Sequence, residues 1–86
     1  MPCVSQFYGI SICFYYNDDV PPHFHAKYAG NEALFSIESL QILGGRVSPR
    51  VRALVDEWAT LHHDEVVANW DLARRSVPLQ AIDPLE

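Results

Sequence analysis

Two histidines separated by one residue are the first candidate for chemistry in this 86-residue sequence. They occur in the segment Pro21-Pro22-His23-Phe24-His25. On an extended strand the two imidazoles share one face, with roughly 6–7 Å between their backbone positions. Such a pair suits one divalent metal ion, Zn²⁺ above all, or an acid and a base acting on one substrate. The alternative is a polar outer sheet face that happens to carry two histidines.

A hairpin predicted around these histidines brings a carboxylate to the candidate site. Alternating runs lie on both sides of Gly30-Asn31, and this dipeptide suits a two-residue turn. Pairing about that turn places His23 opposite Glu38. A carboxylate there would orient the imidazole or raise its pKa. We therefore predict His23, His25 and Glu38 as catalytic residues, with the two histidines as metal ligands.

A second group of polar residues interrupts the apolar stripe of the predicted helix. His62, Glu65 and Asn69 follow one another at i, i+3 and i+7. Buried polar side chains must be paired, so these residues form either a structural network or a second ligand site. The two groups are predicted to face opposite sides. A joint site with the strand histidines therefore requires either that the helix cross the edge of the sheet or that the assignment of the sheet faces be inverted.

The elements that must position these residues follow from hydrophobic periodicity and turn signals. Period-two runs rich in β-branched and aromatic residues predict three strands, at 7–16, 23–28 and 33–38. A helical apolar stripe predicts one long helix at about 49–75, with Ser48 as its N-cap and Pro49 in its first turn. A kink or break near His62-His63 is the alternative to a continuous helix.

The predicted fold class is α+β, within one small domain that spans residues 1–86. A three-stranded antiparallel meander packs against one long or kinked C-terminal helix. An extended tail, residues 76–86, either packs along the domain as a strap or is ordered only by a partner. A three-stranded sheet with one open face also suggests a homodimer.

Composition limits the classes of function. Eleven acidic residues against six basic ones give a formal net charge of −5, which argues against a simple nucleic-acid clamp but leaves RNA open as a substrate. The apolar runs are too short for a membrane span, and the first residues lack the features of a signal peptide. We therefore expect a cytoplasmic protein, in which Cys3 and Cys13 are free thiols.

Several segments together resemble a small bacterial family known as domain of unknown function 4160 (DUF4160). The resemblance runs over nearly the whole chain, and its residues are Phe7-Tyr8-Gly9-Ile10, Asn17-Asp18, Pro21-Pro22-His23-Phe24-His25-Ala26, Trp58-Ala59, Leu61-His62, Asn69-Trp70 and Pro84-Leu85. It implies functional weight at the positions of His23, His25, His62, Glu65 and Asn69. A basic residue often follows the helix histidine in the family, and this chain has His63 there.

The resemblance also implies a genetic context. Members are small bacterial proteins, commonly encoded beside another short protein, in arrangements that look like toxin–antitoxin modules. Our leading interpretation is therefore a partner-binding component of such a two-gene module. The rival interpretations are an RNase-type hydrolase that uses His23 and His25, with Glu38 or Glu65 as orienting group, and a metal-binding module without turnover.

Overall fold

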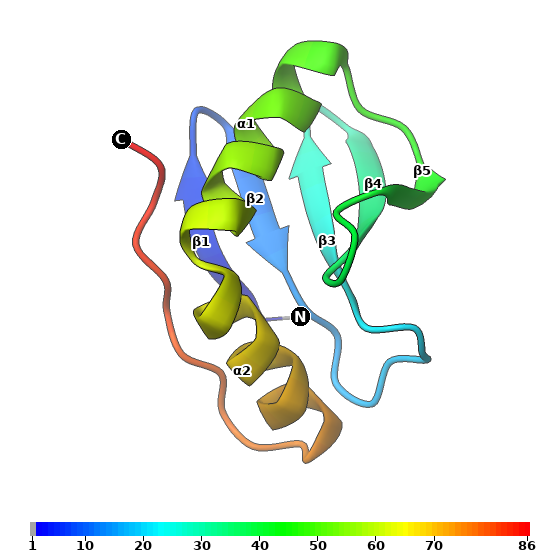
Figure 1. The fold of residues 1–86 in the computed structure, drawn as a ribbon, viewed down its shortest axis with the longest axis vertical. Coiled ribbons are helices and arrows are strands. Elements are labelled where there is room, and N and C mark those ends of the chain that lie inside the picture. Colours follow the sequence, from blue (N-terminus) through cyan, green and yellow to red (C-terminus); the bar gives the residue numbers. More distant parts are fainter. Residues whose placement is uncertain (1) are drawn as a thin grey trace.

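A computed structural model describes residues 2–86, and its central element is one antiparallel sheet (Figure 1). The strands follow chain order across this sheet: β1 (Cys3–Phe7), β2 (Ile10–Cys13), β3 (His23–Tyr28), β4 (Asn31–Ser36) and β5 (Ile42–Gly45). Two helices follow, α1 (Pro49–Leu61) and α2 (His63–Arg74). The fold is α+β, but the predicted three-stranded sheet with one long helix is wrong, because the sheet has five strands and the helix is divided.

The predicted strand at 7–16 is in fact half of a hairpin. Tyr8 and Gly9 form the turn between β1 and β2, and both have positive φ, 51° and 80°. This conformation is the one that a two-residue hairpin turn requires. The error arose because Tyr8 continues the apolar alternation of its neighbours, so that Gly9 alone marked the turn.

The β3–β4 hairpin has a register that differs by two residues from the predicted one. Its turn residues are Ala29 and Gly30, with φ of 48° and 83°, rather than Gly30-Asn31. His23 consequently pairs with Ser36, and the predicted pairing with Glu38 is wrong. A shift of two residues leaves every side chain on its expected face, since the side-chain period of a strand is two.

The helical region begins as predicted and is interrupted at the alternative position. The hydroxyl of Ser48 accepts a hydrogen bond from the backbone N–H of Val51 (3.2 Å), and Pro49 occupies the first turn. His62 separates the two helices, with φ of −115° and ψ of 29°. The break near His62-His63 was therefore the correct alternative, and the continuous helix was wrong.

The core fills the space between the sheet and α1. The rings of Phe24 and Phe35 stack with their centroids 5.5 Å apart, and Trp58 of α1 meets Phe24 edge to face. All three side chains are fully buried. Alternation along β3 thus directs Phe24 toward the helix, and it directs the two histidines of the same strand to the opposite face.

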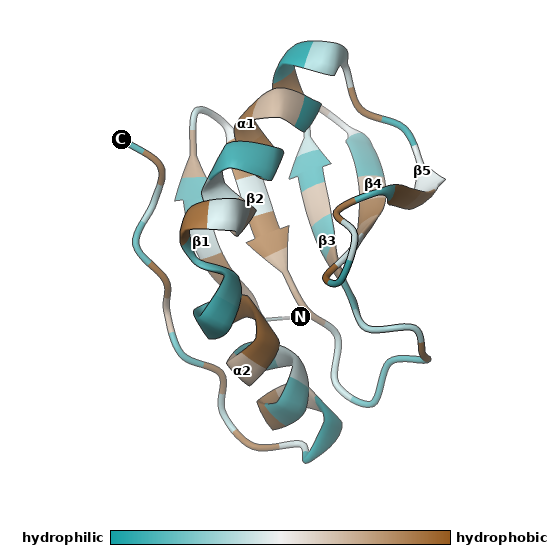
Figure 2. Cartoon of the chain, in the orientation of Figure 1, coloured by the Kyte–Doolittle hydropathy of each residue, from teal (hydrophilic) through white to brown (hydrophobic). Residues whose placement is uncertain are grey.

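The C-terminal tail packs along the domain as a strap, which is one of the two predicted alternatives. The backbone N–H of Ile82 donates to the carbonyl oxygen of Val4 (2.8 Å), and the indole N–H of Trp58 donates to that of Asp83 (2.9 Å). Figure 2 shows apolar and polar residues alternating along this strap. Its apolar members Ile82 and Leu85 are buried. The tail therefore covers the outer edge of β1.

Cys3 and Cys13, which were predicted to be free thiols, form a disulfide between β1 and β2. Disulfides are typical of oxidising compartments, so this bond does not fit the reducing compartment from which the free thiols were predicted. The prediction of free thiols rested on a reducing compartment, and the β1–β2 hairpin that sets the two cysteines opposite each other was not predicted. Neither helix of the described residues has the length and hydropathy needed to cross a bilayer.

Candidate metal centre

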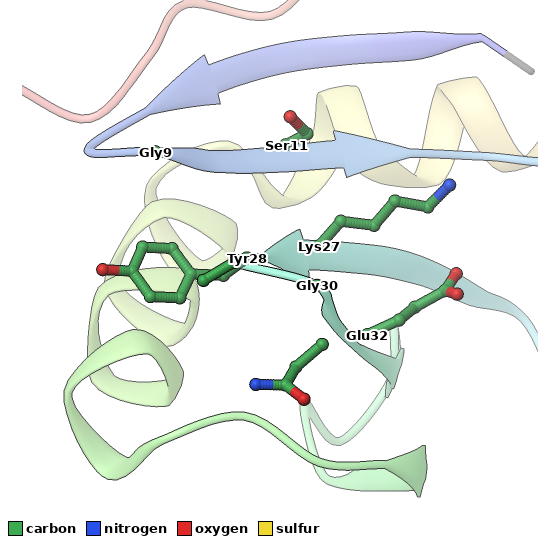
Figure 3. A pocket seen from close by; sticks show the side chains of 8 residues that line it. Gly9, Ser11, Lys27, Tyr28, Gly30 and Glu32 are labelled. Atoms are coloured by element: carbon green, nitrogen blue, oxygen red, sulfur yellow. The ribbon is translucent and has the colours of Figure 1, made fainter.

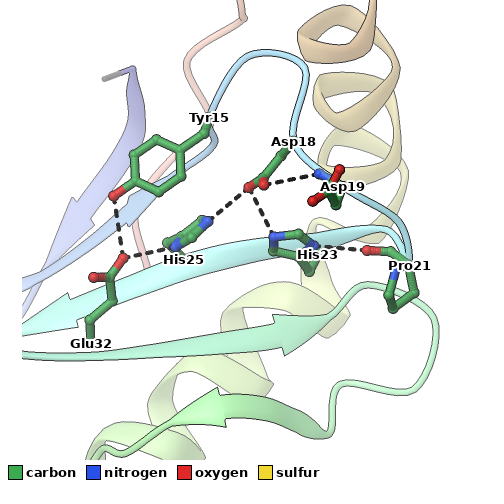
Figure 4. Close-up of polar contacts among 7 residues, drawn as sticks. All are labelled: Tyr15, Asp18, Asp19, Pro21, His23, His25 and Glu32. Carbon is green, nitrogen blue, oxygen red and sulfur yellow. Dashed lines mark hydrogen bonds and ion pairs between the residues drawn. The ribbon is translucent and has the colours of Figure 1, made fainter.

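The histidines His23 and His25 lie on the face of β3 that is turned away from α1. Both are nevertheless buried, each with 6% of its surface exposed. The connection from β2 to β3 covers them, because it folds back over the strand (Figure 4). Tyr15, near the start of this connection, packs its ring edge-on against His25, with 4.1 Å between centroids. On the other side, the ring of Trp70 lies 5.4 Å from that of His23.

Asp18 in this connection brings the two histidines together. Its Oδ2 atom lies 2.9 Å from Nε2 of His23 and 3.1 Å from Nε2 of His25. The connection is held in place by the backbone N–H of Asn17, which donates to the carbonyl oxygen of Ala73 in α2 (3.2 Å). Sequence reasoning missed Asp18, since Asn17-Asp18-Asp19 has the composition of an ordinary turn.

The opposite nitrogen of each imidazole is also bound to an oxygen atom. Nδ1 of His23 donates to the carbonyl oxygen of Pro21 (2.8 Å), and Nδ1 of His25 donates to Oε2 of Glu32 (2.8 Å). The hydroxyl of Tyr15 donates to the same Glu32 oxygen at 3.3 Å. Partners of this kind fix the tautomer and the ring orientation of metal-binding histidines.

In this arrangement, neutral imidazole rings have no proton left on Nε2 to donate to Asp18. A neutral imidazole has one N–H donor and one lone pair, and a carbonyl or carboxylate oxygen can only accept. With Nδ1–H donated to Pro21 or Glu32, the Nε2 lone pair of a neutral ring faces the lone pairs of Asp18. The contacts are attractive only if both rings are imidazolium cations or if a metal cation replaces the Nε2 protons.

The environment of Asp18 favours its ionised form. Partial burial raises the pKa of this carboxyl group, but the hydrogen bond from His25, the backbone N–H of Asp19 and the charge of His23 outweigh that effect. The net result is a pKa below the ordinary value for aspartate. An ionised carboxylate is the form that binds a cation.

The geometry suits a single ion. Asp18, His23 and His25 each offer one ligand atom, and these atoms all lie within 4.8 Å of one another. Among residues 2–86, this is the one such group of three or more histidine, cysteine or acidic side chains. Two imidazoles and one carboxylate form a common ligand set for zinc and for non-haem iron.

The other predicted site residues lie apart from this group. Glu38 is exposed and lines a hollow of about 260 Å³ together with His63 and Trp70. His62 pairs with Glu65 on the helix surface (Nδ1 to Oε1, 2.8 Å). Asn69 contacts neither of these groups and is bound to the tail instead. The predicted orienting role of Glu38 therefore has no support in the geometry, and Glu32 occupies that role for His25 instead.

Asn69 is a structural residue that fastens the tail to α2. Its amide N–H donates to the carbonyl oxygen of Gln80, and its Oδ1 accepts from the backbone N–H of Gln80, both at 2.8 Å. The side chain is almost fully buried. Both hydrogen-bonding groups of the amide are thus used within the fold, and the structural alternative for His62, Glu65 and Asn69 fits these contacts.

A shallow hollow lies on the same sheet face as the histidines (Figure 3). Its volume is about 360 Å³, and its polar lining includes Ser11, Lys27 and Glu32. Figure 3 shows the side chains of Lys27 and Glu32 extending in the same direction along the sheet. Glu32 therefore belongs both to the hollow and to the hydrogen-bond network of His25.

A family model described as "Domain of unknown function (DUF4160)" matches residues 9–71. The matched span includes Asp18, His23, His25 and Glu32. No curated protein and no solved structure matches the chain.

Proposed function

We propose that this chain, which belongs to the DUF4160 family, binds one divalent transition-metal ion through Asp18, His23 and His25. The observation that supports this proposal is the convergence of both Nε2 atoms on one oxygen of Asp18, at 2.9 and 3.1 Å. Both Nδ1 atoms are held by oxygen acceptors on the far sides of the rings. When both rings are neutral, a cation between the three groups replaces the repulsion between their lone pairs by coordinate bonds.

The ligand types indicate which ion. Imidazole suits Zn²⁺, Ni²⁺, Cu²⁺ and Fe²⁺, whereas Mg²⁺ and Ca²⁺ prefer sites made only of oxygen atoms. We therefore expect Zn²⁺ as the resident ion. Three protein ligands leave a further position open, as in catalytic zinc sites. RNase-type hydrolysis is the enzymatic form of this proposal.

The decisive experiment is a metal titration. Isothermal calorimetry measures the binding of the ion, and the visible absorption of Co²⁺ reports its ligands. The natural chain is expected to bind one ion, and Asp18→Asn is expected to lose more than about 100-fold in affinity. The matched control is the double variant His62→Gln, His63→Gln, which removes two histidines outside the site and should bind as the natural chain does. Equal affinities for all three proteins would refute the proposal.

Hydrolysis is tested separately. A purified sample loaded with Zn²⁺ is incubated with RNA, beside a sample treated with a chelator and the Asp18→Asn variant. Cleavage that requires both the ion and Asp18 would support an enzyme. RNA that stays intact in every sample would leave a metal-binding module without turnover.

A second candidate function is partner binding, as a component of a two-gene toxin–antitoxin-like module. It is favoured by apolar side chains left on the surface: Leu43, Leu61 and Val67 are 48%, 67% and 44% exposed. Val67 also lines the hollow beside Glu38, where Pro22 and Ile37 contribute apolar surface. An exposed apolar side chain beside further apolar surface, as at Val67, is typical of an interaction site.

The test of this second function is to mix the chain with the product of the adjacent gene at micromolar concentration. Co-elution as one complex would support it, and separate elution would count against it. Light scattering of the chain alone decides the predicted homodimer in the same experiment.

A further inference from the structure

The two edges of the sheet differ in what covers them. The strap covers β1 through the hydrogen bond from Ile82 to Val4. β5 forms the other edge, and no strand follows it in the sheet of residues 2–86. Its Leu43 side chain is 48% exposed. Edge strands present unpaired N–H and C=O groups in a row, which is a template for another strand.

Positive charge gathers directly after this edge. The segment from Ser39 to Val55 contains Arg46, Arg50 and Arg52 and no acidic residue, although the chain has a net charge of −5. All three arginines are exposed. The first turn of α1 also lacks acidic side chains, so the positive end of the helix dipole is uncompensated there.

The edge and the charges are close in space. Only residues 46–48 connect β5 to α1. Four residue steps span at most about 14 Å, so the start of the helix stays near the end of the strand. Figure 1 shows β5 and the first turn of α1 on the same side of the molecule.

We infer that the β5 edge binds an extended acidic segment of a partner protein, which adds to the sheet as a further strand. Main-chain hydrogen bonds to β5 supply the pairing, Leu43 supplies apolar contact, and the arginines attract the carboxylates of the segment. This inference rests on the second candidate function, partner binding, and is independent of the metal site. A strand is favoured over a nucleic acid because the ladder groups of an edge match a peptide backbone.

The experiment uses the full chain and labelled probes followed by fluorescence anisotropy. The first probe is a peptide of roughly ten residues, longer than an average strand, that alternates Glu with Val and Thr. The second has Lys in place of Glu, and the third is a single-stranded RNA of the same length. We expect saturable binding of the acidic peptide alone, together with slower hydrogen exchange at the amides of residues 42–45.

Two charge reversals with equal effect on net charge locate the contact. Arg50→Glu with Arg52→Glu should weaken binding of the acidic peptide by about tenfold or more. Arg74→Glu with Arg75→Glu, at the end of α2, should leave it within about twofold. Both pairs are exposed, so the fold is expected to survive both changes.

Each other outcome overturns the inference. Equal binding of the lysine peptide, preferential binding of RNA, absence of binding, or equal losses in the two charge variants would all do so. A complex with the adjacent-gene product that tolerates Arg50→Glu and Arg52→Glu would keep partner binding and reject the β5 edge. Failure of that complex to form at all would reject the second function itself, and the metal titration is unaffected by either result.

Discussion

The carboxylate of Glu32 holds the ring of His25 from the neighbouring strand, with 2.8 Å between Oε2 and Nδ1. The two residues are diagonal neighbours, because His25 pairs directly with Leu34 in the β3–β4 ladder. Long side chains can span such a diagonal. Glu32 thereby fixes the nitrogen that His25 presents to Asp18, without itself facing the three converging ligand atoms.

Glu32→Gln should therefore weaken metal binding without abolishing it. Outer partners of metal-binding histidines are worth about 10–100-fold in affinity. The matched control is Glu38→Gln, which removes a carboxylate that sequence reasoning had placed beside His23 but that is exposed in the structure. Competition with a chromogenic chelator measures both affinities. Equal values for the two variants would remove Glu32 from the site.

Acid should destabilise the metal-free protein through Asp18. The pKa of this group is lower in the folded chain than in the unfolded chain. Its contribution to stability is therefore present above the unfolded pKa, about 3.9, and is lost as the pH falls through the lower folded value. Urea titrations in the presence of a chelator measure the free energy of unfolding of the natural chain and of Asp18→Asn. The two values should differ more at neutral pH than near pH ~3. A difference that does not change with pH would contradict this assignment.

Gly45→Ala should disrupt the pairing of β5. The residue has φ of 75°, and a Cβ atom there would clash with the carbonyl oxygen of Glu32. We expect a loss of about 2–4 kcal/mol in the free energy of unfolding. Gly44→Ala is the matched control, because no atom lies within 4 Å of its added Cβ. Denaturant titration compares the two, and similar losses would mean that β5 tolerates the clash.

Asn69→Ala should release the strap. The change removes both hydrogen bonds to Gln80 and empties a buried position, which costs about 1–3 kcal/mol. Hydrogen exchange at the amide of Ile82 should accelerate, since that group is bound to Val4. Glu65→Ala serves as the control, because its exposed contact with His62 should contribute less than about 0.5 kcal/mol. An unchanged exchange rate at Ile82 would show that the strap is held elsewhere.

Reduction of the disulfide should destabilise the chain without unfolding it. Cys3 and Cys13 are ten residues apart, and closing so short a loop contributes at most about 3 kcal/mol. Thermal melting with and without a reductant measures the change. The double variant Cys3→Ser, Cys13→Ser should melt at the lower temperature and should not respond to the reductant. A response in the variant would point to another cause.

Sequence periodicity predicted the faces of the strands better than their pairing. His23 and His25 do share a face, because side-chain alternation depends only on local backbone geometry. The turn at Tyr8-Gly9 was missed, and the turn at Ala29-Gly30 was placed one residue too late, since Tyr8 and Ala29 adopt positive φ without being glycine. Such conformations are uncommon for these residue types and have no marker in the sequence.

Asp18 and Glu32, the two site residues that were not predicted, were missed for a different reason. Asp18 lies on an irregular connection whose path depends on its contact with α2 at Ala73. Glu32 reaches His25 only in the register that the Ala29-Gly30 turn sets. Both depend on tertiary packing, and local patterns carry no information about either. Ser48, by contrast, caps a helix through neighbouring atoms alone, and its role was predicted correctly.

All three converging ligands come from residues 18–25, a single contiguous stretch of the chain. Little chain entropy is therefore lost when they assemble, since loop-closure entropy grows with the length of the loop. The short stretch is not self-contained, however: a graft of this candidate centre onto another antiparallel sheet would have to carry the glutamate of the neighbouring strand and the α2 surface against which the connection rests.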